Sequence, residues 1–518
     1  MKLQEDSIKW AISHILKESD NDLFPRPYEL NVIKESTLEI IDSIKGIEIG
    51  SYKWNPARRF LVPKDSTAFR NATQLDIFDS IIFASIIKEF GYLIEQKRIP
   101  ENEKTIFSYR FRPLTDGTLY ANKKAWESFY TKSKQVASAY SHIVMCDISD
   151  FYNQINLHTI ENQLINCDFP NQIKKVIKEL LISITQRSSK GIPIGPHASH
   201  LLAEMSLIPF DDNLKLQNIA FKRYVDDIII FCNSEKDARI KLNIVAEILD
   251  KEQRLVLQKQ KTRIIKSEEF IELCEQYLLE KPINKIEAEI LDIINEHSSG
   301  DSYSKIQLTE LDDEDLKSLE QENIEELFDS YLRSKEPNYE RIRWLFRRLS
   351  QIGIPNAVDY SIEHFYELIP ALNDVCLYIS SCANNYTSSW STIGEQIIDL
   401  LEDDMIESNE FYRISLLNLF VYNSNLNNID KLIRLFGGLS GNLKRKIILS
   451  SIKYNSSSWL RSLKESYNTF DNWTKRAFLI AATKLPAEER EYFFKGISPS
   501  LNDNNYFEKI IIKWAKSK

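Results

Sequence analysis

Two adjacent carboxylates, Asp226 and Asp227, stand inside an apolar stretch that runs from Phe221 to Cys232. Burying an unpaired charge is costly, so acids in such surroundings usually serve a cation. The residues on both sides are mainly β-branched or aromatic, which predicts two short strands. We therefore expect a β-hairpin with both carboxylates at its tip, where they could bind a divalent metal ion.

A third carboxylate, Asp147, ends a short apolar strand predicted over residues 142–147, and a helical pattern follows it. Three carboxylates from adjacent strands can hold two Mg²⁺ ions, with Mn²⁺ as the alternative metal. Two such ions clamp the attacking and leaving oxygens of a phosphoryl transfer. Taken alone, Asp147 could equally cap the helix that follows. The acidic hairpin downstream favours the metal site.

Five segments occur in an order that resembles the fingers and palm of a reverse transcriptase. They are residues 62–70 (VPKDSTAFR), the strand that ends at Asp147, and residues 191–196 (GIPIGP), 224–227 (YVDD) and 257–262 (LQKQKT). The resemblance spans residues 58–266. It implies an α+β fold with an antiparallel sheet and packed helices, and it implies a nucleotidyltransferase that polymerises DNA.

The same resemblance assigns a role to each charged residue. Asp147 and Asp226 are expected to bind the metal ions, and Asp227 is expected to be a weaker or outer ligand. Lys64 and Arg70 are expected to contact the β and γ phosphates of the nucleotide. The alternative for both cations is an ordinary solvated surface position.

Tyr152, Gly195 and Lys261 complete the expected site. Tyr152 lies where the family places an aromatic ring under the sugar, which would exclude a 2′-hydroxyl; the alternative is a core residue. Gly191 and Gly195 bracket a turn, with Gly195 at the nucleotide and Pro196 in the first turn of the next helix. Lys261 resembles the residue that donates a proton to the leaving pyrophosphate.

The helix after Pro196 places Ser199, Ala203 and Ser206 on one face. Small residues allow close approach of a nucleic acid, or equally of another helix. Ile194 stands where most reverse transcriptases have a glutamine that holds template and nucleotide. Because isoleucine has no hydrogen-bonding side chain, we expect template reading to be altered or dispensable.

Composition limits the class of protein. The chain has 518 residues, a hydrophobic content of 43% and a net charge of −9, which is unusual for a protein that grips a long duplex. The net charge does not exclude a local basic groove, because cations in the fingers half alternate with aromatic residues that could stack bases. The cations are Arg58, Arg59, Lys64, Arg70, Arg110, Arg112, Lys123, Lys124, Lys132 and Lys134, and the aromatic residues are Phe107, Tyr109, Phe111, Trp126, Phe129 and Tyr130. An amphipathic helix with a solvated face is the alternative for the lysines from Lys123 to Lys134.

No signal segment or membrane-length apolar stretch is recognisable, and the six cysteines form no CxxC pair. We expect a soluble, cytoplasmic protein with buried cysteines and no membrane partner. Pattern, charge and the family resemblance together divide the chain into an N-terminal helical segment (1–50), fingers and palm (51–266), an acidic helical connector (267–332) and a helical, HEAT-like domain (333–518). An irregular helical domain is the alternative for the last segment.

A palm with Ile194 and Ala203–Glu204, fused to a helical carboxyl half, resembles the bacterial abortive-infection (Abi) reverse transcriptases of antiphage defence. Residues 475–490 also resemble segments of that group. The resemblance implies defence by DNA synthesis from dNTPs, in some members without a template and primed from a protein tyrosine that stays attached to the DNA. It also implies homo-oligomers. Tyr28, Tyr52, Tyr109 and Tyr120 precede the palm and are candidate primers.

Two other functions stay open at this point. One is an RNA-templated reverse transcriptase of the retron or mobile-element type, with a bound noncoding RNA. The other is an inactive scaffold that acts through its helical domain. The intact acids argue against a scaffold, because an unused cluster of buried acids would only destabilise the fold.

Overall fold

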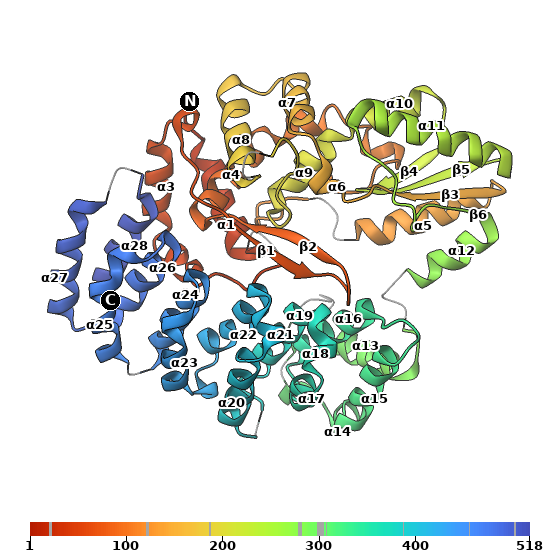
Figure 1. Ribbon diagram of the computed structural model, residues 1–518. Coiled ribbons are helices and arrows are strands. Elements are labelled where there is room, and N and C mark those ends of the chain that lie inside the picture. The colour runs from red at the N-terminus through yellow and green to blue at the C-terminus, as the bar shows by residue number, and fades with distance from the viewer. Residues whose placement is uncertain are drawn as a thin grey trace. The chain divides into compact units, whose positions relative to one another are not determined.

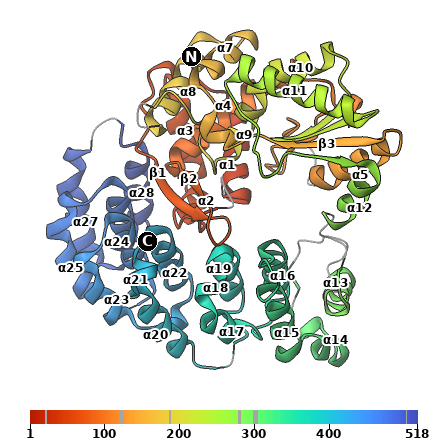
Figure 2. The ribbon, with the colours of Figure 1, turned by 45° about the vertical axis from the view of Figure 1, so that its right-hand side comes forward.

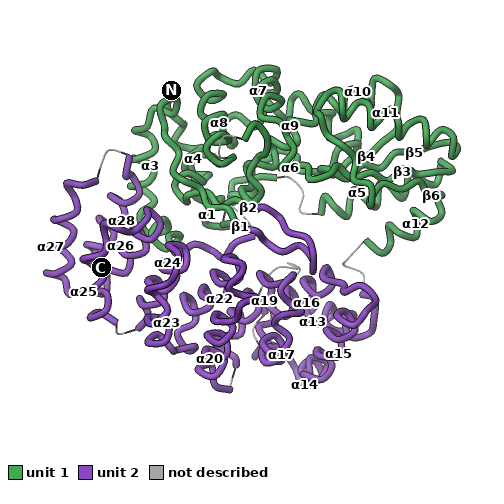
Figure 3. Tube along the Cα trace, viewed as in Figure 1, with its two compact units in different colours: residues 1–22, 29–59, 72–278 green, residues 23–28, 60–71, 279–518 purple. Residues whose placement is uncertain are grey.

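The computed structural model describes residues 1–518 except 20–22, 121–123, 186–187, 278–281, 298–304, 307, 387, 455 and 502–503. The described chain forms two compact units, coloured separately in Figure 3. Unit 1 comprises residues 1–22, 29–59 and 72–278, and unit 2 comprises residues 23–28, 60–71 and 279–518. The four segments expected from the sequence stay a prediction.

Unit 1 is built around a four-stranded antiparallel sheet with the order β4-β5-β3-β6. β3 (His142–Asp147) lies between β5 (Asp227–Cys232) and β6 (Arg263–Lys266), and β4 (Phe221–Tyr224) pairs with β5 (Figure 1). The strand predicted over 142–147 and the acidic hairpin are both confirmed. Their Ile, Val and Phe residues suit a pleated surface that is buried on both faces.

The strands alternate between two covered faces. Ile143, Ile229 and Phe231 pack on one face against α5 (Ala125–Ala137) and α12 (Ser267–Gln276). That core also contains Phe107, Phe129, Tyr130, Ala137, Ile265, Phe270 and Cys274. Figures 1 and 2 show α11 (Glu235–Gln253) on the opposite face. The sheet is therefore a buried layer whose end is the position available for chemistry.

The remaining helices of unit 1 surround the sheet and a long buried helix, α4 (Ile77–Glu95). Asp76 begins α4, because its side chain accepts the Phe78 N–H at 3.0 Å. The other helices are α1 (Glu5–Glu18), α2 (Leu30–Glu35), α3 (Thr37–Gly46), α6 (Phe151–Gln154), α7 (Leu157–Asn166), α8 (Asn171–Ile184), α9 (His197–Ser206) and α10 (Ile208–Leu216).

Unit 2 is mostly helical, as expected for the carboxyl half. The helices α16 (Tyr339–Ile352), α19 (Leu372–Ser381), α22 (Glu410–Tyr422), α24 (Gly441–Ser450), α26 (Asn472–Ala481) and α28 (Tyr506–Lys516) pack in succession, each on the next (Figure 2). The others are α13 (Lys285–His297), α14 (Asp313–Ser318), α15 (Gln321–Leu332), α17 (Val358–Glu363), α18 (Phe365–Leu368), α20 (Trp390–Leu401), α21 (Asp404–Glu407), α23 (Ile429–Leu435), α25 (Ser457–Ser466) and α27 (Ala487–Ile497). The HEAT-like description stays a prediction.

A separate hairpin, formed by β1 (Arg58–Pro63) and β2 (Phe69–Gln74), carries the fingers residues. Its residues 60–71 belong to unit 2. There the Arg343 guanidinium donates to the Lys64 carbonyl, and the Asn409 amide donates to the Leu61 carbonyl at 3.0 Å. The tip of the hairpin is thus held by the helices of the carboxyl half.

Two broader expectations can also be compared with the structure. All six cysteines lie in the described part of the chain, where they are buried free thiols, as predicted. Within that same part, no helix combines the length and the apolar character needed to cross a bilayer.

The core beside the sheet gives a stability prediction. Phe129 is fully buried and contacts the rings of Phe107, Trp126 and Tyr130. Replacing it with alanine should lower the free energy of unfolding of unit 1 by about 3–5 kcal/mol, because a large cavity remains. Chemical denaturation followed by tryptophan fluorescence measures this. Tyr92→Ala, at a ring that is 48% exposed in the same unit, is the control and should change little.

Candidate active site

The three predicted acids meet at one end of the palm sheet. The register of β3 and β5 pairs Asp147 directly with Asp227. Side chains at directly opposed positions of antiparallel strands lie on the same face. Asp226 stands in the turn before β5, and its carbonyl accepts the Ile148 N–H at 3.2 Å. The strand order and the turn therefore bring together residues that are about 80 positions apart in the sequence.

Lys261 is the cation among these acids. Its ammonium forms an ion pair with the Asp147 carboxylate, whose side chain is only 8% exposed. Burial opposes the charge on Lys261. The hydrogen bond and charge of Asp147, together with the charges of Asp227 and Asp226, nevertheless raise its pKa above the ordinary value. One ammonium is thus influenced by all three carboxylates.

The donor chemistry of the site fits a divalent ion. Carboxylate oxygens are the ligands that Mg²⁺ prefers, and Asp147 is buried where a compensating cation is required. Among the described residues, however, no three His, Cys, Asp or Glu side chains form a ready-made metal cage. Lys261 holds the position beside Asp147 in this structure. A metal ion that binds Asp147 would have to compete with that ammonium.

Tyr152 is held by an aromatic stack that sequence reasoning missed. Its hydroxyl and Nδ1 of His200 share a hydrogen bond of 2.6 Å. The His200 ring is stacked on Tyr109 with centroids 4.1 Å apart. Burial, and then the nearby His197, lower the pKa of His200 to about 3, so its imidazole is neutral at pH 7. Burial raises the pKa of Tyr152 well above the usual value, with contributions from the charges of Glu204 and Asp226. The Tyr152 ring is only partly buried.

The segment of residues 191–196 has backbone angles that glycine makes possible. Gly191 has φ +103° and Gly195 has φ +134°, values that glycine adopts readily. Ile194 forms a β-bridge with Ala72, and the turn between the two glycines stays a prediction. Between them, the Ile194 carbonyl accepts the Thr73 N–H at 2.7 Å. Pro196 differs from expectation: α9 begins at His197, so Pro196 precedes the helix as its cap residue. The fixed φ of proline suits that position as well as the first turn.

The small-residue face of α9 packs inside unit 1. Ser199, Ala203 and Ser206 are each fully buried. Helix α9 contacts α4 and α7. Of the two alternatives, the structure therefore favours close packing of helices over an approach by nucleic acid.

The prediction of a base-stacking groove is wrong for most of the aromatic residues that it included. Phe107, Phe129 and Tyr130 are buried in the core beside the sheet, and Trp126 packs against them. Arg110 is buried too and forms an ion pair with Glu95. The mixed pattern of cations and rings reflected a hydrophobic core with buried ion pairs, because a single sequence does not show which rings face inward.

Lys64 and Arg70 are both exposed on the hairpin of unit 2, whereas the acids belong to unit 1. Their contact with nucleotide phosphates stays a prediction. Among the candidate primers, Tyr52 donates its hydroxyl to buried Asp79 at 2.6 Å, and Tyr120 donates to the His197 carbonyl at 2.5 Å. Both hydroxyls are thus engaged inside unit 1.

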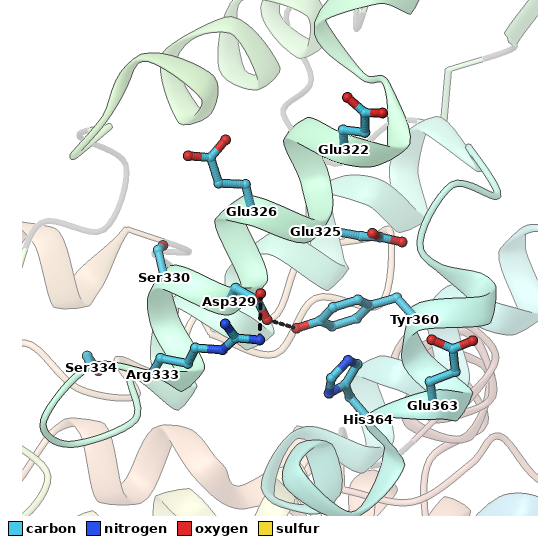
Figure 4. Close-up of a pocket in the computed structure, with 10 residues that line it drawn as sticks. All are labelled: Glu322, Glu325, Glu326, Asp329, Ser330, Arg333, Ser334, Tyr360, Glu363 and His364. Carbon is cyan, nitrogen blue, oxygen red and sulfur yellow. Dashed lines mark hydrogen bonds and ion pairs between the residues drawn. The ribbon is translucent and has the colours of Figure 1, made fainter.

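A hollow of about 760 Å³ in unit 2 has no predicted site residue in its lining. Figure 4 shows Glu322, Glu325 and Glu326 around it. Asp329 accepts the Tyr360 hydroxyl at 2.8 Å and pairs with Arg333 at 2.9 Å. The polar groups at the centre of this hollow are bound to one another.

The antiparallel sheet, the acids at its end and the helices packed on it all belong to unit 1. Residues 63–276 match the family model described as "Reverse transcriptase (RNA-dependent DNA polymerase)". The chain therefore contains a reverse transcriptase domain and is a nucleotidyltransferase, followed by a helical carboxyl half. This confirms the expected fold class and enzyme class.

The other comparisons are more distant, and no curated protein matches the chain. Apo telomerase from Candida tropicalis is 10% identical, with 74% of each chain covered and a TM-score of 0.31. Telomerase from Candida albicans in complex with a fragment of telomeric RNA is 10% identical, with 84% of this chain and 68% of that chain covered and a TM-score of 0.28. Similarities this weak carry no functional argument.

The ion pair of Lys261 gives a prediction about metal dependence. Lys261→Met removes the ammonium that competes at Asp147, so half-maximal activity should require less Mg²⁺. If Lys261 is the expected proton donor to pyrophosphate, the turnover number should also fall about a hundredfold. A Mg²⁺ titration of initial rates measures both effects. Lys259→Met, an exposed lysine of the same loop, is the control. An unchanged Mg²⁺ requirement would show that the ammonium does not compete.

Tyr152 gives a prediction about sugar selection. Tyr152→Ala should lower the ratio of kcat/KM for dNTPs over rNTPs about tenfold or more, because the ring no longer excludes the 2′-hydroxyl. Tyr152→Phe keeps the ring and loses only the bond to His200, so it should keep most of the discrimination. If the alanine variant gains no ribonucleotide incorporation, Tyr152 is not the gate.

Proposed function

We propose that this chain is a DNA polymerase of the reverse transcriptase type that acts in phage defence, within the abortive-infection group. It would transfer nucleotides from dNTPs without a template and prime synthesis on a protein tyrosine. The observation that carries the catalytic part is the meeting of Asp147, Asp226 and Asp227 around one lysine at the end of the palm sheet. The defence part is supported by the sequence resemblance to that group.

Ile194 supports the proposal that synthesis needs no template. Ile194 occupies the position of the usual glutamine, and its backbone carbonyl is engaged by Thr73. The side chain offers a template base no hydrogen bond. A polymerase that lacks this contact depends less on a template than its relatives do.

Each residue of the site has a chemical part in this proposal. Asp147 and Asp226 would hold Mg²⁺, with Asp227 beside them. When bound, the ions lower the pKa of the attacking hydroxyl and neutralise the triphosphate. Lys261 would give its proton to the leaving pyrophosphate, and Tyr152 would exclude a 2′-hydroxyl. Lys64 and Arg70 would bind the β and γ phosphates.

The proposal also names partners. They are dNTPs, a DNA product attached to a tyrosine, and further copies of this chain in a homo-oligomer. The protein would act in the cytoplasm, and its carboxyl half would be HEAT-like. A noncoding RNA belongs to the second candidate, an RNA-templated reverse transcriptase of retron or mobile-element type. The family description, an RNA-dependent DNA polymerase, favours that candidate. An inactive scaffold is the third candidate.

A single assay separates these functions. The purified protein is incubated with Mg²⁺ and labelled dNTPs, with and without RNA and primer, and the product is analysed before and after protease treatment. The proposal predicts synthesis without a template and a product that migrates with the protein until protease releases it. Strict dependence on RNA would support the second candidate, and no synthesis under any condition would support the scaffold.

The catalytic assignment has its own test in the same assay. Asp226→Ala should lower the rate by about three orders of magnitude or more while the protein stays folded, because a ligand for the metal ions that stabilise the transition state is lost. Asp250→Ala, an exposed acid on α11, controls for the loss of a carboxylate in unit 1 and should keep full activity. Retained activity of Asp226→Ala would refute the assignment.

A further inference from the structure

The turn that carries the acids contains an unfavourable backbone conformation. Val225, immediately before Asp226, has φ +55°. Among the described non-glycine residues with positive φ, Val225 is the only β-branched one. The left-handed region is disfavoured for such side chains because the branched Cβ crowds the backbone. A conformation of this kind persists only where the surroundings hold it.

Both backbone polar groups of Val225 are held by buried side chains. Its N–H donates to the Ser108 hydroxyl at 2.9 Å, and its carbonyl accepts from Nη1 of Arg223 at 2.8 Å. Ser108 donates its own proton to Glu204. Ser108, Glu204 and Arg223 are each fully buried.

Five residues of a buried ionic network form what we call the turn clamp: Arg98, Ser108, Glu204, Asp211 and Arg223. Outside the clamp, Arg98 also pairs with Glu95 at 3.1 Å. Arg223 donates to Asp211 at 2.8 and 2.5 Å and to Glu204 at 3.3 and 3.0 Å. Arg98 donates to Glu204 at 2.7 Å. The clamp thus contains two guanidinium groups and two carboxylates, so its charges balance.

Such a network calls for an explanation beyond stability. Replacing buried ion pairs with apolar residues of similar size is often neutral or stabilising, so their presence is weak evidence for a stabilising role. In this chain the network binds both backbone polar groups of Val225, which adjoins the acids proposed to be catalytic. Through Arg98 it also binds the carbonyls of Ser108 and Tyr109. A network of charges with several bonds per member also has few alternative geometries.

We propose that the turn clamp is a positioning device for the active site: Ser108 and Arg223 hold Val225 in its left-handed conformation and thereby fix the direction of Asp226 and Asp227. The proposal rests on the catalytic role proposed for these acids. Ser108 and Arg223 are positioning residues, because they contact the turn and not the reacting atoms.

The test uses the strain itself. Ser108→Ala removes one bond to Val225, and the turnover number should fall about ten- to a hundredfold with little change in the KM for dNTPs, because the acids lose their alignment. Glycine adopts the left-handed conformation without support. Val225→Gly alone should therefore keep the rate within about twofold. The double variant Ser108→Ala/Val225→Gly should regain most of the rate lost in Ser108→Ala.

Two measurements separate positioning from a merely structural role. Thermal unfolding is recorded for every variant, and Ser85→Ala is the matched control, since its buried hydroxyl donates only within its own helix, to the Ile81 carbonyl at 2.7 Å. Ser85→Ala should keep the full rate. Binding of Mn²⁺, followed by electron paramagnetic resonance, reports on the acids without any need for turnover. Ser108→Ala should weaken it about tenfold, and Val225→Gly should restore it in the double variant.

The outcomes are distinct from those of the catalytic proposal. If Asp226→Ala stays active, the acids are not catalytic, whatever the clamp does. If Ser108→Ala keeps both its rate and its Mn²⁺ affinity, or if Val225→Gly rescues neither, the clamp does not position the turn. If Ser108→Ala does not fold, Arg223→Lys is used in its place, alone and combined with Val225→Gly. If Val225→Gly then restores none of the rate lost in Arg223→Lys, the proposal is again overturned.

Discussion

The constraint on which this structure depends is the repulsion among carboxylates gathered at the end of an apolar sheet. Asp147 and Asp227 oppose each other across β3 and β5, and Asp226 lies in the adjoining turn. Like charges at such positions destabilise a sheet unless a cation offsets them. Lys261 supplies that cation in this structure, and all three acids raise its pKa. The same excess of negative charge would attract a divalent ion in the proposed function.

Two buried supports lie behind the acids, and both pass through one short segment. Ser108 holds the backbone of Val225, and its neighbour Tyr109 stacks on His200, which shares a hydrogen bond with Tyr152. The segment that contains them joins α4 to α5 and carries no reverse transcriptase motif. It nevertheless supplies Ser108, which holds the turn of the acids, and Tyr109, which stacks on the partner of the expected sugar gate, Tyr152. Residues that hold a catalytic group in place are often outside the motif that contains the group, because they need only buried hydrogen bonds and tight packing.

The helical carboxyl half has a physical connection to the fingers hairpin. Arg343 bridges the Lys64 and Pro370 carbonyls, and Asn409 donates to the Leu61 carbonyl. Phe24 adds ring contacts with Phe60 and Phe411 within the same unit. A hairpin that carries two candidate phosphate ligands is thus packed as part of the helical unit. Backbone hydrogen bonds and aromatic packing thus connect the helices of this unit to the hairpin that carries Lys64 and Arg70.

Local pattern in the sequence determined the strand over 142–147, the hairpin of Asp226 and Asp227 and the helical carboxyl half, because period-two and helical spacing are properties of neighbouring residues. The family motifs determined which acids to examine. Tertiary structure alone decided that Lys261 pairs with Asp147, 114 positions away, that Arg343 holds the hairpin from 279 positions away, and that Phe107, Phe129 and Tyr130 are core residues. Only packing selects which of many equivalent cations, serines or rings meets a distant partner, and spacing along the chain carries no record of that choice.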